Sequence, residues 1–326
     1  MHYLISTLCL AAILFSGCSY ENANTIDISG NPSTAELFAP GIISTNLYER
    51  DIAISPDGTE IVFTLGDYRQ LRRCLVMIKR LGTDWSKKEI LSFSGLYDDI
   101  EPFFSGDGNK LYFVSNRPIE GDTTRKDYNI WITERTTNGW TNPAPLPSVV
   151  NSSQDEFYPS VSRNNNLYFT SVRENGIGSE DIYISRIADG EYSEPVPLDT
   201  TINSVTYEFN AYVNPDETLI IFSSYGRKDD MGGGDLYYSL KDSSGVWESA
   251  VNMGPGINSE KLDFCPFVDK VRGNLYFTSD RTSNFKMRFE NTGELENFAN
   301  QVLNGTGNIY RIHMEKVIPN YNRKSN

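Results

Sequence analysis

One segment of the chain occurs five times in degenerate form, and this repetition restricts the possible folds more than any other feature. In residues 101–117, EPFFSGDGNKLYFVSNR, an apolar segment, a Gly-Asp-Gly turn and an alternating apolar segment predict a β-hairpin. The central phenylalanine of the second strand recurs at spacings of 50, 56, 53 and 55 residues. The five positions are Phe63, Phe113, Phe169, Phe222 and Phe277. A period of this length is typical of repeat folds, in which each copy buries its apolar surface against its neighbours.

The repeated unit contains four predicted strands. Each hairpin is followed by a third apolar segment, such as residues 130–132, and then by a fourth that opens with an aromatic residue after a glycine turn. Four antiparallel strands repeated five times predict an all-β fold, a β-propeller of five four-stranded blades. Only four fourth strands follow a hairpin, so we expect residues 36–44 to supply the last one and close the ring. A sixth, degenerate blade is the alternative. The domain is predicted at residues 35–318, with a C-terminal tail at 319–326.

The hairpin motifs resemble those of a known repeat family. Ser-Pro-Asp-Gly at residues 55–58, together with Leu-Tyr-Phe and Ser-Asn-Arg or Ser-Asp-Arg after later turns, is similar to the TolB-type, WD-like β-propeller repeat of bacterial envelope proteins. The resemblance covers nearly all of residues 35–318. It implies the propeller fold but no particular activity, since one fold can carry many functions.

The N-terminal segment is typical of an export signal. Residues 4–15 are apolar and uncharged, and their length suits a signal-peptide core rather than a membrane span. The following Ser-Gly-Cys resembles a bacterial lipobox, which implies a lipoprotein signal peptide at residues 1–17, a diacylated Cys18 and a flexible tether at 18–34. We therefore expect an outer-membrane lipoprotein of the bacterial cell envelope that touches the membrane through its lipid alone. A plain secretory signal with an incidental cysteine is the alternative.

The composition excludes some partners and leaves few cysteines to consider. The formal net charge is −14, which disfavours nucleic acid and anionic headgroups as partners. Apart from Cys9 and Cys18, only Cys74 and Cys265 remain. In a closed ring their repeats are neighbours, so they could form a disulfide or remain buried thiols. We expect no cofactor and a monomeric protein.

Charged residues recur at fixed positions of the hairpins. An acid precedes the first strand of every copy, and in four copies an arginine follows the second strand, where the two should face each other across the hairpin. Such a ring of arginines could bind a carboxylate or a glycan, or the pairs could fix the strand register; their recurrence favours the structural role. The first copy has Asp67 and Arg69 instead of the aligned arginine, which could mark a specialised sector. The four predicted pairs are Asp99 with Arg117, Glu156 with Arg173, Glu208 with Arg227, and Asp263 with Arg281.

The last copy contains an insertion. Between Phe277 and Ile309 lie 31 residues, against 11, 16, 12 and 13 in the other copies, and residues 294–303 have helical spacing of apolar side chains. The insertion either packs on the propeller or forms a lid that binds a partner. With Asp67 and Arg69, its candidate partner-binding residues are Phe285, Met287, Arg288 and Phe289.

The sequence offers few catalytic residues. Its two histidines are His2, in the signal segment, and His313, so neither a Ser-His-Asp triad nor a histidine-rich metal site is evident. We therefore predict a non-enzymatic, lipid-anchored scaffold that binds an envelope protein or a glycan through its loop face. The alternative is a glycan-active hydrolase or lyase with a carboxylate-based site in the propeller channel. Two carboxyl groups about 5 to 9 Å apart in a cleft, outside the repeated pairs, would favour this alternative.

Overall fold

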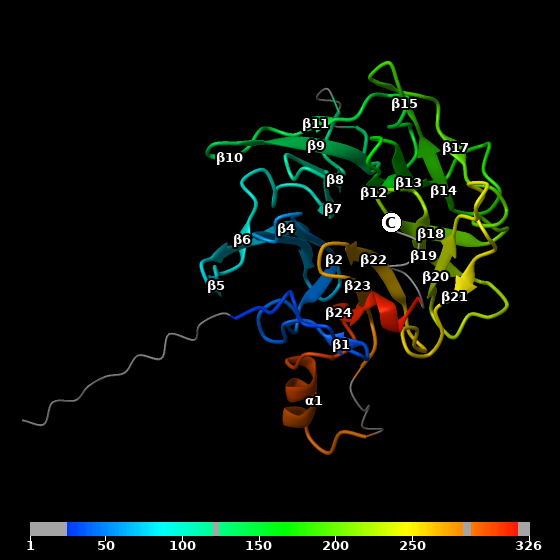
Figure 1. The fold of residues 1–326 in the computed structure, drawn as a ribbon. Helices are drawn as coiled ribbons and strands as arrows, with labels where there is room; N and C mark the ends of the chain where they lie inside the picture. Colours follow the sequence, from blue (N-terminus) through cyan, green and yellow to red (C-terminus); the bar gives the residue numbers. More distant parts are fainter. Residues whose placement is uncertain (1–24, 120–123, 283–287, 319–326) are drawn as a thin grey trace, which may run out of the picture.

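The fold is a five-bladed β-propeller, as the sequence predicts (Figure 1). The computed structural model describes residues 25–119, 124–282 and 288–318. Five antiparallel sheets surround a central channel, and the chain runs through each blade from the channel outward. Within the described residues, no helix is long and apolar enough to cross a membrane.

Each blade has three well-formed strands and a short outer edge. Blade one contains β2 (Tyr48–Ile54), β3 (Glu60–Gly66), β4 (Arg73–Leu81), β5 (Asp84–Trp85) and β6 (Glu89–Ile90). Blade two contains β7 (Asp99–Phe104), β8 (Lys110–Ser115), β9 (Asn129–Thr136), β10 (Gly139–Trp140) and β11 (Ala144–Pro145). Blade three contains β12 (Glu156–Val161), β13 (Leu167–Ser171), β14 (Asp181–Ser185) and β17 (Val196–Pro197), with a small hairpin of β15 (Ile187–Ala188) and β16 (Glu191–Tyr192). Blade four contains β18 (Tyr207–Val213), β19 (Leu219–Tyr225), β20 (Asp235–Leu240) and β21 (Val251–Asn252). Blade five contains β22 (Asp263–Asp269), β23 (Asn274–Ser279), β24 (Asn308–His313) and β1 (Glu36–Leu37), and a 3-10 turn, η1 (Met314–Lys316), follows it.

The ring is closed by the N-terminal strand, as predicted. β1 pairs antiparallel with β24, with Glu36 opposite Arg311 and Leu37 opposite Tyr310. The Arg311 guanidinium lies 2.9 Å from the Glu36 carboxylate. Strands from both ends of the domain therefore complete blade five, and the open edge that a linear array would have is removed.

The core lies between the blades. The five repeated phenylalanines are fully buried, and those of blades three to five stack on a tyrosine of the next strand with ring centroids 5.7 to 6.1 Å apart. Each cluster joins residues of adjacent blades; one contains Ala53 and Val62 of blade one with Leu111 and Phe113 of blade two. The repeat is thus held together by burial between neighbours, which gives the channel its fixed walls.

The inner strand of every blade contains a bulge near its start. The pairing register shifts just before the third residue of the inner strand in blades two, three and five, and just before the fourth in blades one and four. The residue at the bulge has a φ of 50° to 58°, which is uncommon for a residue with a side chain. These five bulge residues are Asp51, Glu101, Tyr158, Asn210 and Cys265.

The acids and arginines singled out in the sequence form buried ion pairs. The nitrogen–oxygen distances are 2.5 Å for Arg117–Asp99, 3.0 Å for Arg173–Glu156, 2.9 Å for Arg227–Glu208 and 2.6 Å for Arg281–Asp263, and all four carboxylates are buried. Each arginine also donates to a backbone carbonyl in the outer part of the preceding blade. These contacts link one blade to the next.

The strand register differs from the expected one, in which the acid and the arginine lie directly opposite each other across the hairpin. Asp99 is opposite Ser115 rather than Arg117, so the arginine folds back over two residues to reach the acid. The inner strand also begins at Asp99, three residues earlier than the pattern indicated, because the bulge interrupts the alternation of side chains. In blade one Glu49 takes its hydrogen bonds from Thr45 and Asn308 instead of an arginine.

The part of the insertion that the structure describes does not cover the channel. It contains α1 (Thr292–Ala299), whose N-terminus is capped by Asn291 and which has no buried residue. Figure 1 shows α1 outside the ring of blades, beside blade five. The helix itself has no buried residue and is not over the mouth of the channel, whereas Leu303, beyond its C-terminus, packs against the core cluster of blades four and five.

Candidate functional site

The bulges bring five residues from five blades together around the channel. Asn210 Nδ2 donates to Glu101 Oε1 at 3.3 Å, and the Cys265 thiol lies 3.5 Å from Asn210 Oδ1. The backbone N–H of Tyr158 donates to Glu101 Oε2 at 2.7 Å. Consecutive members of this set are at least 50 residues apart in the sequence, so only ring closure makes them neighbours.

Two of the five are carboxylates that contact one guanidinium. Arg50 Nε lies 2.7 Å from Asp51 Oδ2, and Arg50 Nη2 lies 2.9 Å from Glu101 Oε1. The guanidinium is small and planar, so these contacts place the two carboxylates within about 8 Å of each other. Both carboxylates are buried, and neither belongs to the repeated ion pairs.

The Glu101 carboxyl has a strongly shifted pKa. Burial raises it, the neighbouring Asp51 carboxylate raises it further, and the Arg50 guanidinium and the Tyr158 N–H lower it; the result is a pKa of about 7. Near neutral pH Glu101 is therefore present in both its protonated and its ionised form. This is the behaviour required of a general acid that works near pH 7.

A cleft of about 270 Å³ lies at the mouth of the channel. Glu101 and Asn210 lie in its lining, and its walls include the residue just before the bulge in every inner strand. Aromatic and aliphatic side chains beside a few polar groups are typical of ligand sites. The five residues before the bulges are Arg50, Ile100, Phe157, Phe209 and Phe264.

The candidate partner-binding residues of the sequence do not meet at this site. Asp67 accepts hydrogen bonds from the backbone N–H groups of Arg69 and Arg72 and so orders its own loop, while the Arg69 side chain is exposed. Arg288 is also exposed, and the Phe289 ring lies 5.8 Å from that of Phe298 in α1. Phe285, Met287 and Cys18 lie outside the described residues.

The five bulge residues were not predicted as site residues, although the sequence contains a signal for them. They stand two positions after the repeated acid of each blade, where the five copies have Asp, Glu, Tyr, Asn and Cys. The repeated acid is Asp or Glu in every blade, whereas the bulge position has a different residue in each blade. A position at which the repeat loses its symmetry is where an asymmetric site can form.

The two cysteines of the propeller do not form a disulfide. Cys74 and Cys265 are both free thiols. Burial raises the pKa of the Cys265 thiol well above its usual value. In the part of the chain that the structure describes, no group of three or more His, Cys, Asp and Glu side chains could hold a metal ion.

Comparison with known proteins shows the fold alone. The chain is similar to a putative TolB from Agrobacterium tumefaciens (16% identity, 74% of this chain and 72% of that one, TM-score 0.46). It is also similar to TolB from Acinetobacter baumannii (12%, 80% and 53%, TM-score 0.42), of which it spans about half the length. A third match is the GH43 endo-arabinanase from Bacillus licheniformis (12%, 82% and 93%, TM-score 0.49). No protein-family model matches the chain. No curated protein matches it either.

The expectation that the chain is not an enzyme was wrong. The similar structures include the endo-arabinanase and the catalytic domain of the GH62 α-L-arabinofuranosidase from Coprinopsis cinerea, both of which are enzymes by name. The expectation rested on the scarcity of histidines, whereas a site made of two carboxyl groups needs none. Asp51 and Glu101 form a carboxylate pair outside the repeated ion pairs, and of the two only Glu101 lines the cleft.

Proposed function

We propose that the protein is a glycan-active hydrolase whose site is the mouth of the propeller channel. The observation that supports this most strongly is the pair formed by Asp51 and Glu101, in which both carboxylates contact Arg50 and the Glu101 pKa is about 7. Glycoside hydrolysis typically uses two carboxyl groups about 5 to 9.5 Å apart, one of them protonated, and the shared contacts with Arg50 keep this pair within about 8 Å. The aromatic residues at the cleft, among them Phe157 and Phe209, offer apolar faces to sugar rings.

The two carboxyl groups have different roles in this proposal. Glu101 lines the cleft and transfers its proton to the glycosidic oxygen as the bond from that oxygen to the anomeric carbon breaks. Asp51 lies deeper and stabilises the positive charge that develops on the sugar. Water then adds to the anomeric carbon, and its proton returns to a carboxylate. Arg50 holds both carboxylates in position.

The test is hydrolysis of a panel of polysaccharides, measured as release of reducing ends. Glu101→Gln and Asp51→Asn should each reduce kcat by about 10²- to 10⁴-fold. The matched control is Asp107→Asn, an exposed carboxylate in the β7–β8 turn at the far end of the inner hairpin of blade two, which should leave kcat unchanged. Circular dichroism and thermal melting establish that the variants fold. Full activity in folded Glu101→Gln, or no cleavage of any glycan by the unaltered protein, would refute the proposal.

The anchor and the location also remain proposals. The apolar segment and the Ser-Gly-Cys sequence support lipidation at Cys18 and an outer-membrane position. Metabolic labelling with a radioactive fatty acid, with Cys18→Ser as the control, tests the lipid directly. Loss of the label in Cys18→Ser is the expected result.

A further inference from the structure

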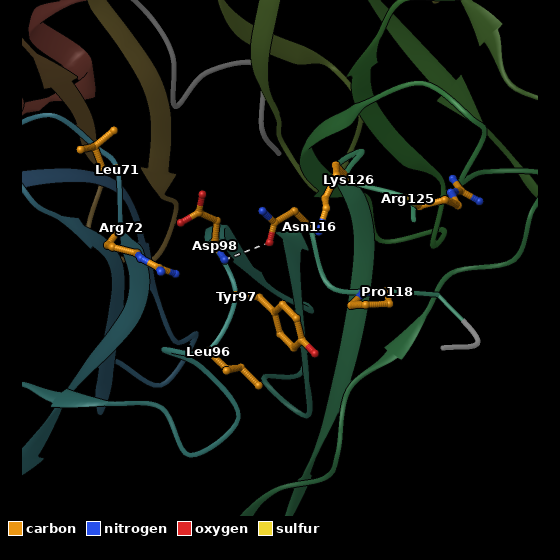
Figure 2. A pocket seen from close by; sticks show the side chains of 9 residues that line it. All are labelled: Leu71, Arg72, Leu96, Tyr97, Asp98, Asn116, Pro118, Arg125 and Lys126. Atoms are coloured by element: carbon orange, nitrogen blue, oxygen red, sulfur yellow. Dashed lines mark hydrogen bonds between the residues drawn. The ribbon is translucent and has the colours of Figure 1, made fainter. Parts of the chain in front are cut away.

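A second cleft lies beside the channel mouth, between blades one and two (Figure 2). Its volume is about 410 Å³, and its walls come from the loop after β3, the segment before β7 and the loop after β8. Figure 2 shows Arg72 extending from one side, Lys126 on the other, and Tyr97 with Leu96 between them. This cleft is separate from the carboxylate pair.

Cationic side chains from two blades meet in this cleft. Arg72 and Lys126 are exposed, and among the described residues neither side chain has a hydrogen bond or an ion pair. Arg125 also lines the cleft and is paired with Asp127. The one acid of the lining, Asp98, is already neutralised by Arg73 at 3.2 Å. The cleft is therefore locally cationic on a protein of net charge −14.

Apolar surface lies beside these cations. Leu71 and Leu96 are 64% and 72% exposed, although large aliphatic side chains are usually buried. The Tyr97 ring is half-buried and stands 5.6 Å from the Arg117 guanidinium, which fixes its orientation. A sugar ring has an apolar face that can pack on such side chains, and a carboxylate on that sugar could reach Arg72 or Lys126.

The two clefts share a wall. Asp98 lines the cationic cleft and Arg73 lines the channel cleft, and these two side chains are bonded to each other and to the Tyr128 hydroxyl. A polymer whose scissile bond lies at Glu101 would pass over this wall and place a neighbouring sugar in the cationic cleft. We infer that the cationic cleft is a subsite for a uronic acid residue, so that the substrate is an acidic glycan. This inference rests on the proposed function.

The experiment measures binding without hydrolysis. Calorimetry with Glu101→Gln protein would use oligomers of galacturonate, glucuronate and mannuronate, each compared with its methyl ester, which keeps the sugar but lacks the charge. At least one acid oligomer should bind more tightly than its ester. Replacing Arg72 and Lys126 together by Gln should weaken that binding about 100-fold, roughly tenfold for each charge-assisted contact. Binding of the ester should be unaffected.

Matched control substitutions are available on the same face. Arg69→Gln lies in the same loop as Arg72, and Lys228→Gln lies in the corresponding loop of blade four; both side chains are exposed and neither lines the cleft. Both controls should bind the acid oligomer like the parent. Equal affinity for acid and ester, no binding of any acid oligomer, or no loss in the double variant would overturn the subsite. Failure of the proposed function is a separate result, because it is measured as absent cleavage by the unaltered protein.

Discussion

Replacing Arg173 by Met tests whether the repeated ion pairs stabilise the propeller. Arg173 Nη2 lies 3.0 Å from Glu156 Oε1 and also donates to the Val150 carbonyl; Arg173 is 12% exposed and Glu156 is fully buried. Without the arginine, the Glu156 carboxylate keeps hydrogen bonds from Ser152 and Ser171 but has no cation. Breaking a buried pair in this way costs about 3–5 kcal/mol of unfolding free energy when the remaining acid is ionised.

The cost should depend on pH, and its sign follows from the Glu156 pKa. Burial raises this pKa to about 7, although Ser152 and Arg173 lower it. A folded-state pKa above the usual value of 4.5 means that the stability linked to Glu156 is present below about pH 4.5 and is lost as the pH rises through 7. Removing Arg173 raises the folded-state pKa further, so this loss becomes larger. At pH 5 the carboxyl is neutral in both proteins, and the variant should lose only about 1–2 kcal/mol from the bond to Val150 and from packing.

The assay is urea unfolding followed by tryptophan fluorescence at pH 5 and pH 8. Arg173→Met should lower the free energy of unfolding by about 1 kcal/mol more at pH 8 than at pH 5, because a folded-state pKa of about 7 limits the linked difference at pH 8 to about 1.4 kcal/mol. Arg69→Met, at an exposed arginine in blade one, should change it by less than about 0.5 kcal/mol at either pH. An equal cost at both pH values would show that the loss of stability comes from packing and not from the unpaired charge of Glu156.

Because the Glu101 pKa is about 7, kcat/KM should fall about tenfold per pH unit above pH 7, where the ionised carboxylate cannot donate a proton. A kcat/KM that does not change with pH above 7 would contradict the role of Glu101 as general acid. Asn151→Ala removes two bonds to the backbone of Ile130 and one to a neighbouring carbonyl, and should lower the urea-derived unfolding free energy by about 2–4 kcal/mol. Gly178→Ala would place Cβ 2.3 Å from a backbone oxygen and should lower the Tm, whereas Gly106→Ala, with no atom within 4 Å, should not.

Much of the propeller could be predicted because its determinants are local in sequence. The five buried phenylalanines recur with the hairpins, and β8 spans Lys110–Ser115 as the alternation of apolar residues indicated. Five hairpins but only four fourth strands indicated that a strand near the N-terminus completes the last blade, and β1 is that strand. Alternation and turn chemistry act over a few residues, and the repetition reinforces weak local signals.

The insertion shows where a local pattern stops being informative. The spacing in residues 294–303 predicted a helix, and α1 occupies Thr292–Ala299. Its position outside the ring could not be deduced, because the apolar residues of a short helix do not specify which surface they contact. The tertiary structure leaves Leu295 51% exposed and the channel mouth uncovered by this helix.

The number of blades, the closure of the ring and the acids and arginines that meet within the hairpins all follow from the sequence alone. The candidate site depends on the tertiary structure. A bulge with positive φ at a residue such as Glu101 has no sequence signature of the kind that glycine provides, and it changes which residue reaches the channel. Closure of the ring then joins Asp51 to Glu101 through Arg50 and removes water from them, which raises the pKa of Glu101. Burial and proximity across blades arise only when all five repeats are assembled.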